Sequence, residues 1–250
     1  MSSPVSMPPE AESPPVSFPA RFMGVFISPG ETFEDIARCP GFIAPLIAVV
    51  VASLVVLETM LAKIGMERMI RQLLEQGGQA AKMSADQLEQ AVHSGATLGT
   101  VIAHVGVLIL GPAALLIWAG LGLGILILIL GAQAKFKAVF SATCYANLVG
   151  VLGALMAVAL ILFGDPEHFN PNNPVPTNVA FFLNPLETSK AWYSLAGSAD
   201  VLWIWTMVLM AMGWSRVADR KVKPLSVFLV FVGLWMVWVL GKVGFASLFS

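Results

Sequence analysis

The longest uncharged stretch of this chain constrains its fold more than any other feature. From Ala91 to Gln133 there is no Asp, Glu, Lys or Arg, and His93 and His104 are the only ionisable groups. A helix needs about 20 apolar residues to cross the hydrocarbon core of a bilayer, and this stretch is far longer. Hydrophobic residues make up 57% of the chain and charged residues 12%, which is unusual for a soluble domain. The sequence therefore predicts an all-α integral membrane protein.

Five segments have the length and composition of membrane spans. They cover residues 42–61, 97–131, 138–163, 194–214 and 225–245. The second is about twice the minimal length and contains Pro112 and a glycine-rich run, so a hairpin and six spans are an alternative. We expect one long helix kinked at Pro112, because a turn near residues 120–124 would leave backbone polar groups unbonded in lipid. The prediction is about five helices in one bundle, within a single domain over residues 21–250.

Two segments precede the first span. Residues 1–20 are rich in proline, with no basic start and no apolar core, which predicts a disordered tail and not a secretory signal. Ser28, Pro29 and Glu31 have the spacing of a capping box and predict a short helix that ends before Pro40. Its amphipathic pattern suits a helix lying in the headgroup zone.

The connector between the first two spans predicts an amphipathic helical hairpin. Gly77 and Gly78 are expected to end its first helix, because glycine commonly follows the last turn of a helix. Ser84 and Gln87 have the spacing of a second capping box and are expected to begin the second helix.

Basic residues predict the orientation, since Lys and Arg in short loops favour the cytoplasm. They precede spans one and three and separate spans four and five: Arg21, Arg38, Lys135, Lys137, Arg216, Arg220, Lys221 and Lys223. The loop between spans three and four instead holds Asp165, Glu167 and Glu187 against Lys190 alone. We expect a cytoplasmic N-terminus and outer loops at the hairpin and at residues 164–193. Six spans with an outer N-terminus are the alternative.

Four ionisable residues fall within or at the edge of the spans: Glu58, His104, Asp200 and Lys242. Such groups are costly in lipid unless they are paired or hydrated. At about 1.5 Å per residue, Glu58 and Lys242 reach the same outer level, so they could pair, and all four could line one outward-facing polar pocket. The alternative is that Glu58 and Lys242 extend separately to the headgroups and that His104 bonds a backbone carbonyl.

Motifs for catalysis are missing from the sequence. There is no phosphate-binding loop, no His-Glu-x-x-His pair and no Gly-x-Ser-x-Gly elbow, so no catalytic residue and no cofactor is predicted. Gly120 and Gly124 are expected to serve close helix packing instead. Asp165, Glu167 and His168 lie close enough in sequence to touch a metal, but an exposed turn is the favoured interpretation and no metal site is predicted.

Three stretches resemble the Yip (Ypt-interacting protein) domain family of polytopic membrane proteins, and its bacterial-type branch in particular. They are SPGETFEDIARCPGFIAPL, AKFKAVFSATCYANLVGVLGAL and ADVLWIWTMVLMAMGW, and the resemblance covers roughly residues 21–245. In the third stretch Asp200, Trp205 and Gly213 match the family pattern, whereas Leu202 and Trp203 depart from its aromatic spacing. The resemblance implies about five spans and a cytoplasmic N-terminus. Eukaryotic members are linked to small GTPases and membrane shaping, roles that depend on partners of their own.

We therefore expect a non-enzymatic membrane protein that organises membrane or binds lipid or a partner. The bilayer is its expected partner, a protein or a second copy of the chain is a further candidate, and no nucleic acid is expected. A bacterial inner membrane is the expected location, as the resemblance implies. A transporter or channel for a small solute is the alternative, supported by Pro112 and the polar groups in the spans. An intramembrane hydrolase is disfavoured, because Ser141 and His104 belong near opposite faces of the bilayer.

Overall fold

The computed structural model describes residues 16–165, 169–219 and 221–247, and all regular structure in these ranges is helical. The α-helices are α1 (Phe18–Ile27), α2 (Pro29–Arg38), α3 (Ile43–Lys63), α4 (Met66–Gln76), α5 (Ala85–Val105), α6 (Gly111–Gly124), α7 (Phe136–Ala146), α8 (Val149–Phe163), α9 (Lys190–Ser198), α10 (Val201–Val217) and α11 (Pro224–Ser247). Two short 3₁₀ helices are η1 (Ala80–Lys82) and η4 (Val179–Phe182), and two π-helical segments are η2 (Gly106–Leu110) and η3 (Ile125–Ile129).

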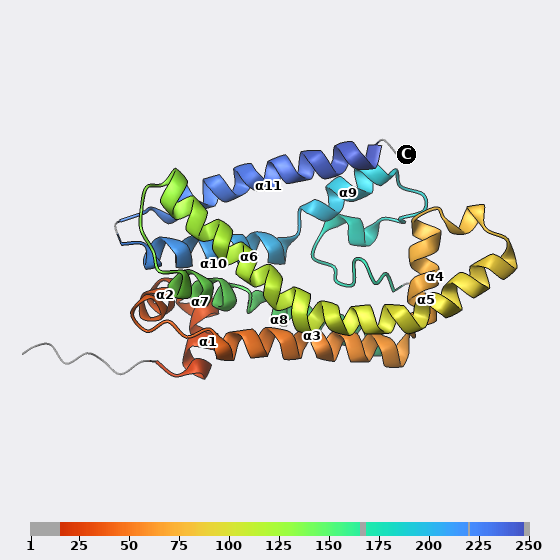
Figure 1. The fold of residues 1–250 in the computed structure, drawn as a ribbon, viewed down its shortest axis with the longest axis horizontal. Helices are drawn as coiled ribbons and strands as arrows, with labels where there is room; N and C mark the ends of the chain where they lie inside the picture. Colours follow the sequence, from red (N-terminus) through yellow and green to blue (C-terminus); the bar gives the residue numbers. More distant parts are fainter. Residues whose placement is uncertain (1–15, 166–168, 220, 248–250) are drawn as a thin grey trace, which may run out of the picture.

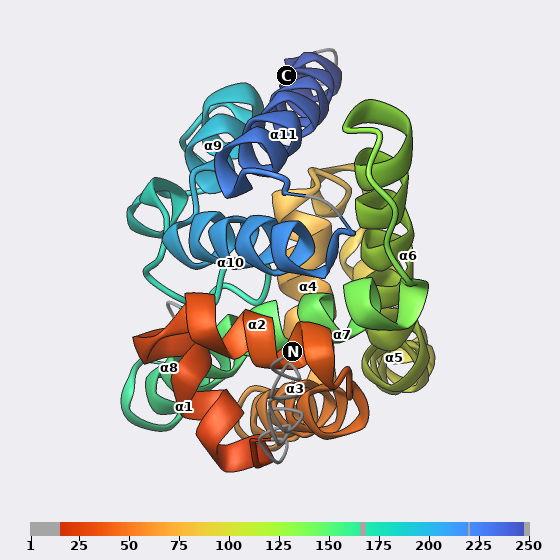
Figure 2. The same cartoon turned by 90° about the vertical axis from the view of Figure 1, so that its left-hand side faces the viewer.

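Four helices are long and apolar enough to cross a membrane. They cover Ile43–Lys63, Ala85–Ile129, Phe136–Phe163 and Pro224–Phe245, and α9 with α10 forms a fifth span if their 45° bend lies within one crossing. The long helices run side by side along the longest axis of the molecule, whereas α1 and α2 lie across one end (Figures 1 and 2). The predicted all-helical membrane bundle is confirmed, with four or five candidate spans.

The second span is one continuous helix, built from α5, η2, α6 and η3. It has 45 residues, about 68 Å at 1.5 Å per residue, and therefore extends well beyond a hydrocarbon core of about 30 Å. Pro112 has no N–H to donate. In the π-helical turn directly before it, the Gly111 amide donates to the Gly106 carbonyl. The hairpin alternative is therefore wrong, since the chain does not turn back near residues 120–124.

The predicted helical hairpin forms from α4 and the first half of α5. Ser84 begins α5 with the expected capping box, in which its hydroxyl accepts from the Gln87 amide and its own amide donates to the Gln87 side chain. The Arg71 guanidinium bonds Glu89 across the hairpin at 2.8 Å. The second helix of the hairpin and the second span are thus one element (Figure 1).

The N-terminal prediction needs two corrections. The helix α1 begins at Phe18, inside the predicted tail, because Pro19 suits a first helical turn and Phe18, Phe22 and Phe26 stack along one side. Residues 1–15 lie outside the described ranges. Helix α2 begins at Pro29 as expected, but the side chain of Ser28 makes no capping bond, and its carbonyl accepts from the amide and the hydroxyl of Thr32 instead.

The apolar side of helix α2 packs on protein and does not face lipid. Phe33 and Ile36 are fully buried, and α2 contacts α7 and α10. Phe33 fills the space left by Gly213, where an added Cβ would lie 2.9 Å from the Phe33 ring. The charged side of α2 is held by an ion pair between Glu34 and Arg216 of α10.

Two predicted spans are interrupted. The segment 138–163 remains one span, but its α-helical pattern is broken at Asn147 and Leu148 between α7 and α8. The segment 194–214 bends by 45° at Ala199 and Asp200 between α9 and α10. Every residue of α7 from Ala138 to Ala146 is buried, which makes α7 the central element of the bundle.

The core is built around Trp214 of α10. Its indole N–H donates to the Thr143 hydroxyl at 3.0 Å, and its ring stacks on Phe231 with centroids 4.9 Å apart. Gly122 of α6 leaves the room for this ring, because a Cβ there would lie 2.6 Å from it. An added Cβ at Gly120 or Gly124 would meet no atom within 4 Å, so the prediction that these two glycines serve helix packing within the chain is wrong.

The glycine pair gives a matched test. We expect Gly122→Ala to lower the free energy of unfolding by about 1–3 kcal/mol, because the new methyl group overlaps a ring that is buried and cannot move aside. Gly120→Ala should leave stability unchanged or raise it by up to about 1 kcal/mol, since alanine favours a helix more than glycine does. Thermal unfolding of both variants in detergent measures the difference, and equal melting temperatures would contradict the packing described here.

Candidate functional site

The four ionisable residues of the spans form two separate pairs and not one cluster. Glu58 of α3 contacts His104 of α5, whereas Asp200 and Lys242 line a common cavity beside α9. The expected pairing of Glu58 with Lys242 is therefore wrong. Helix α11 packs on α9, α10 and η3, while α3 packs on α5 and α8 on the other side of the bundle. Counting residues placed the two groups at one depth but could not place their helices around the bundle.

The Glu58–His104 pair shares a proton by its geometry. His104 Nε2 lies 2.8 Å from the Glu58 carboxylate, and Nδ1 lies 2.8 Å from the Thr100 carbonyl. A carbonyl only accepts, so Nδ1 carries a proton and donates it. The remaining proton then lies on Nε2 or on Glu58, and in either case the pair as a whole is neutral. A neutral pair is far less costly in a span than a separated charge.

Asp200 is held by three hydrogen-bond donors at the start of α10. One carboxylate oxygen caps the helix by accepting from the Trp203 amide at 2.9 Å. The other accepts from the Thr177 hydroxyl and from the Asn178 amide at 3.2 Å. Asp200 therefore begins α10 directly after the end of α9 and holds the loop of residues 169–189 against both helices, which is the physical reason for the bend in this span.

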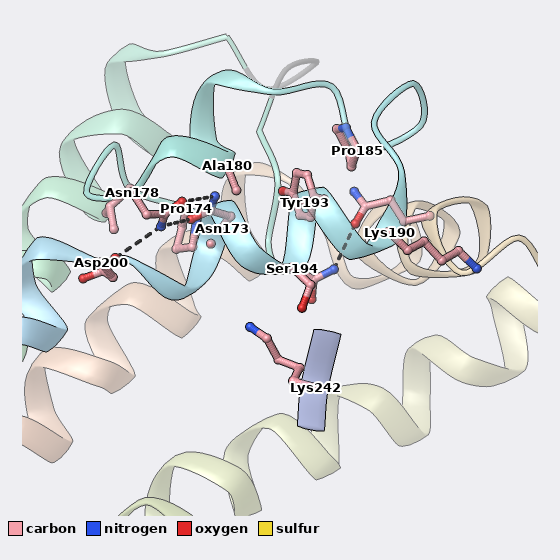
Figure 3. Close-up of a pocket in the computed structure, with 14 residues that line it drawn as sticks. Asn173, Pro174, Asn178, Ala180, Pro185, Lys190, Tyr193, Ser194, Asp200 and Lys242 are labelled. Carbon is pink, nitrogen blue, oxygen red and sulfur yellow. Dashed lines mark hydrogen bonds between the residues drawn. The ribbon is translucent and has the colours of Figure 1, made fainter. Parts of the chain in front are cut away.

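Lys242 reaches the same region from α11. Its ammonium lies 4.8 Å from the centre of the Trp238 ring, a cation–π contact. Figure 3 shows its side chain extending from α11 toward the α9–α10 segment that carries Ser194 and Asp200. These groups border a polar cavity of about 550 Å³, bounded on its other sides by the loop of residues 169–189 and by Gln76.

An amide network in the loop of residues 169–189 was not predicted. The side chains of Asn173 and Asn178 bond each other in both directions at 3.0 and 2.8 Å, and Asn170 donates to the Tyr193 hydroxyl. Asn172 donates to Gln76 of α4, which ties the loop to the hairpin. The Asn-Pro steps were the sequence pattern that pointed to this loop, but they predict only that no helix continues there and not that the amide side chains bond one another.

A buried arginine at the α2 end was also missed as a site. Arg21 is 6% exposed and donates to Asp35 at 2.6 Å and to the Cys39 carbonyl at 3.1 Å. Burial alone would lower the pKa of Arg21, but Tyr145 and Asp35 outweigh it and the pKa is raised. The guanidinium stays charged and joins α1 to the end of α2.

The family follows from comparison with known proteins. The Yip1 domain model matches residues 23–241, which is most of the chain. The chain belongs to the Yip1 domain family. Comparisons with curated proteins and with solved structures give no match.

The matched range covers three of the four ionisable residues of the spans. It includes Glu58, His104 and Asp200 and ends one residue before Lys242. Yip1-domain proteins are generally non-enzymatic membrane trafficking proteins.

The described side chains give no support to a hydrolase or a metal centre. The Ser141 hydroxyl donates to the Lys137 carbonyl at 2.7 Å near the start of α7, and His104 is bonded to Glu58. Across residues 16–165, 169–219 and 221–247, no three His, Cys, Asp or Glu side chains gather closely enough to hold a metal ion. Glu167 and His168 of the considered DPEH turn lie outside the described residues.

The Glu58–His104 pair can be tested by a double-variant cycle. We expect Glu58→Ala and His104→Ala each to lower the melting temperature in detergent, because each leaves a polar partner unbonded. The double variant should lose less than the sum of the two single losses. Lys242→Met combined with Glu58→Ala is the control and should be additive. Additive losses for Glu58 and His104 as well would contradict the pairing.

Proposed function

We propose that this Yip1-domain protein organises the bilayer without catalysing a reaction, by holding apolar interfacial surfaces on one rigid bundle. The outer side of α1 is the observation that carries the proposal. Met23 is 54% exposed and Ile27 is 75% exposed, while Arg21 and Val25 on the opposite side are buried. An exposed apolar strip on a helix at the end of a membrane bundle is suited to the boundary between headgroups and acyl chains.

The attachment of α1 supports a mechanical role. Besides the bond from Arg21 to Asp35, Phe26 packs edge-on against Trp205 of α10 with ring centroids 5.6 Å apart. Phe18 lies beside Tyr145 of α7 at 6.3 Å. A helix fixed in this way cannot leave its position relative to the spans, so it displaces lipid wherever the bundle is inserted and expands that leaflet.

The opposite end carries apolar surfaces as well. Phe182 is 75% exposed and Leu186 is 65% exposed in the outer loop, and Trp192 of α9 is 68% exposed. Tryptophan is favoured at membrane interfaces, where one edge of the ring is apolar and the N–H is hydrated. These residues support contact with the second interface, and the bilayer itself is the proposed partner. A protein or a second copy of the chain on the same surfaces is a further proposal.

We further propose that the α1–α2 end faces the cytoplasm, in a bacterial inner membrane. Basic residues gather at this end, since Lys135 and Lys137 begin α7 and Lys221 and Lys223 precede α11. The two connectors are joined, because the Gln133 amide donates to the Asp219 carboxylate at 2.7 Å and the Asp219 amide donates to the Gln133 carbonyl. Clustered Lys and Arg favour the cytoplasmic side.

Solute transport is the second candidate function. The polar cavity beside Asp200 supports it, because an amide-lined space of about 550 Å³ next to a broken span is typical of a solute site. The missing sequence repeat between the two halves of the chain stands against it.

Labelling tests the orientation. Cys39 is exposed and Cys144 is buried, so a thiol reagent reports on Cys39 alone. In intact cells we expect Cys39 to be protected from a membrane-impermeant maleimide. Cysteines introduced as Ser84→Cys and Asn172→Cys in a Cys39→Ser background should react. Labelling of Cys39 together with protection at Ser84→Cys would reverse the proposed orientation.

Vesicle shape tests the function. Cryo-electron microscopy of liposomes at one protein-to-lipid ratio should show smaller or more strongly curved vesicles with the wild-type protein than with Met23→Gln and Ile27→Gln combined. The control is Met23→Leu with Ile27→Val, which keeps the strip apolar and should behave like the wild type. If the glutamine variant inserts equally well and gives the same vesicle sizes, the proposed role of α1 is wrong.

A further inference from the structure

Two cavities, one about half polar and the other mainly apolar, lie side by side at the break between α9 and α10. The polar cavity of about 550 Å³ lies toward the outer loop and α4. The second, of about 640 Å³, lies between α6, α10 and α11 and is lined mainly by aromatic side chains, Trp118, Trp203, Phe231, Trp235 and Trp238. Gly197, Asp200 and Lys242 border both cavities. The combined space is therefore amphipathic, with its charged groups at the junction.

Lys242 is the group at this junction that is available to bind an anion. Among the described residues, Asp200 and Lys242 are the only ionisable ones that line the aromatic cavity. Both oxygens of Asp200 already accept hydrogen bonds from Trp203, Thr177 and Asn178. Lys242, in contrast, forms no ion pair within the described part of the chain, and its recorded contact is the Trp238 ring. Its ammonium can still donate three hydrogen bonds.

The dimensions of the aromatic cavity suit an acyl chain. Lys242 lies 18 residues after the start of α11 at Pro224, about 27 Å along the helix, which is close to the far boundary of a hydrocarbon core of about 30 Å. Phe231 lies 11 residues before Lys242, about 16 Å deeper. The cavity therefore extends from headgroup level through roughly one leaflet. Leu121 and Leu234 on its rim are 47% and 50% exposed, which leaves it open toward the lipid side of the bundle.

We propose that the joined cavities bind one glycerophospholipid, with its phosphate on the Lys242 ammonium, its glycerol and headgroup among the loop amides, and one acyl chain along the aromatic side chains. Phosphate is a preferred partner of a lysine ammonium, and basic pockets between spans commonly hold lipid headgroups. A small polar solute would fill only the polar half. The site lies at the opposite end of the bundle from α1, so the proposed lipid site does not depend on the bilayer-organising role proposed for α1.

Native mass spectrometry of the delipidated full-length protein in dodecyl maltoside tests this proposal. Dioleoyl phosphatidylglycerol should bind with a stoichiometry of one and at least about tenfold more tightly than dioleoylglycerol, which has the same chains and no phosphate. Lys242→Met should weaken phosphatidylglycerol binding about tenfold and Lys242→Arg should restore it. Lys223→Met, the same charge change at the other end of α11, is the matched control and should bind like the wild type.

A second variant addresses the chain-binding half without altering charge. Leu121→Trp narrows the aromatic cavity and should weaken phosphatidylglycerol binding while leaving the melting temperature of the lipid-free protein within a few degrees of the wild type. Glycerol 3-phosphate, a headgroup without chains, should not compete. Unchanged binding in both Lys242→Met and Leu121→Trp would overturn the proposal, as would an equal loss in Lys223→Met. Full competition by glycerol 3-phosphate would instead assign the polar cavity to a soluble phosphate compound.

Discussion

The burial of Trp214 is the interaction on which the rest of the structure depends. Helices gain little hydrophobic free energy by leaving lipid for one another, so close contact and internal hydrogen bonds must hold them together. Trp214 supplies both, through its stacking on Phe231, its hydrogen bond to Thr143 and its fit against Gly122. One side chain of α10 thus contacts α6, α7 and α11. Gly213, the residue before it, admits Phe33 and so brings α2 onto the same core.

The scarcity of water in the bilayer also explains where the chain breaks and where its ionisable groups lie. A span can be interrupted only if side chains replace the lost backbone bonds. Asp200 does this at the start of α10. After α7 the backbone bonds continue, since the Asn147 N–H donates to the Thr143 carbonyl, and the Asn147 side-chain amide donates to the same carbonyl. An unpaired charge within a span is costly, and Glu58 and His104 avoid this cost by sharing one proton. The helices α3 and α5 therefore contact each other through a neutral pair.

These packing solutions leave the two ends of the bundle with different characters. The α1–α2 end is closed by buried contacts, and its apolar strip is held at a fixed place by Arg21 and Asp35. The α9 end is more open, with an amide-lined loop above an aromatic cavity. Helix α10 joins both ends, since Asp200 lies at one terminus and Arg216, paired with Glu34 of α2, lies at the other. The loop of residues 169–189 and the two N-terminal helices are therefore both attached to α10.

The sequence by itself determined the helical membrane class, the approximate spans, the start of α2 at Pro29 and the cap at Ser84, because composition, length and local capping depend on residues close in the chain. The tertiary structure alone decided which helices are neighbours. Depth along a helix follows from counting residues, but the direction a side chain faces around the bundle depends on packing between distant segments. For that reason Glu58 contacts His104 and not Lys242. The Trp214 ring packs on Gly122 and not on Gly120, and the apolar side of α2 packs against Gly213 and not in lipid.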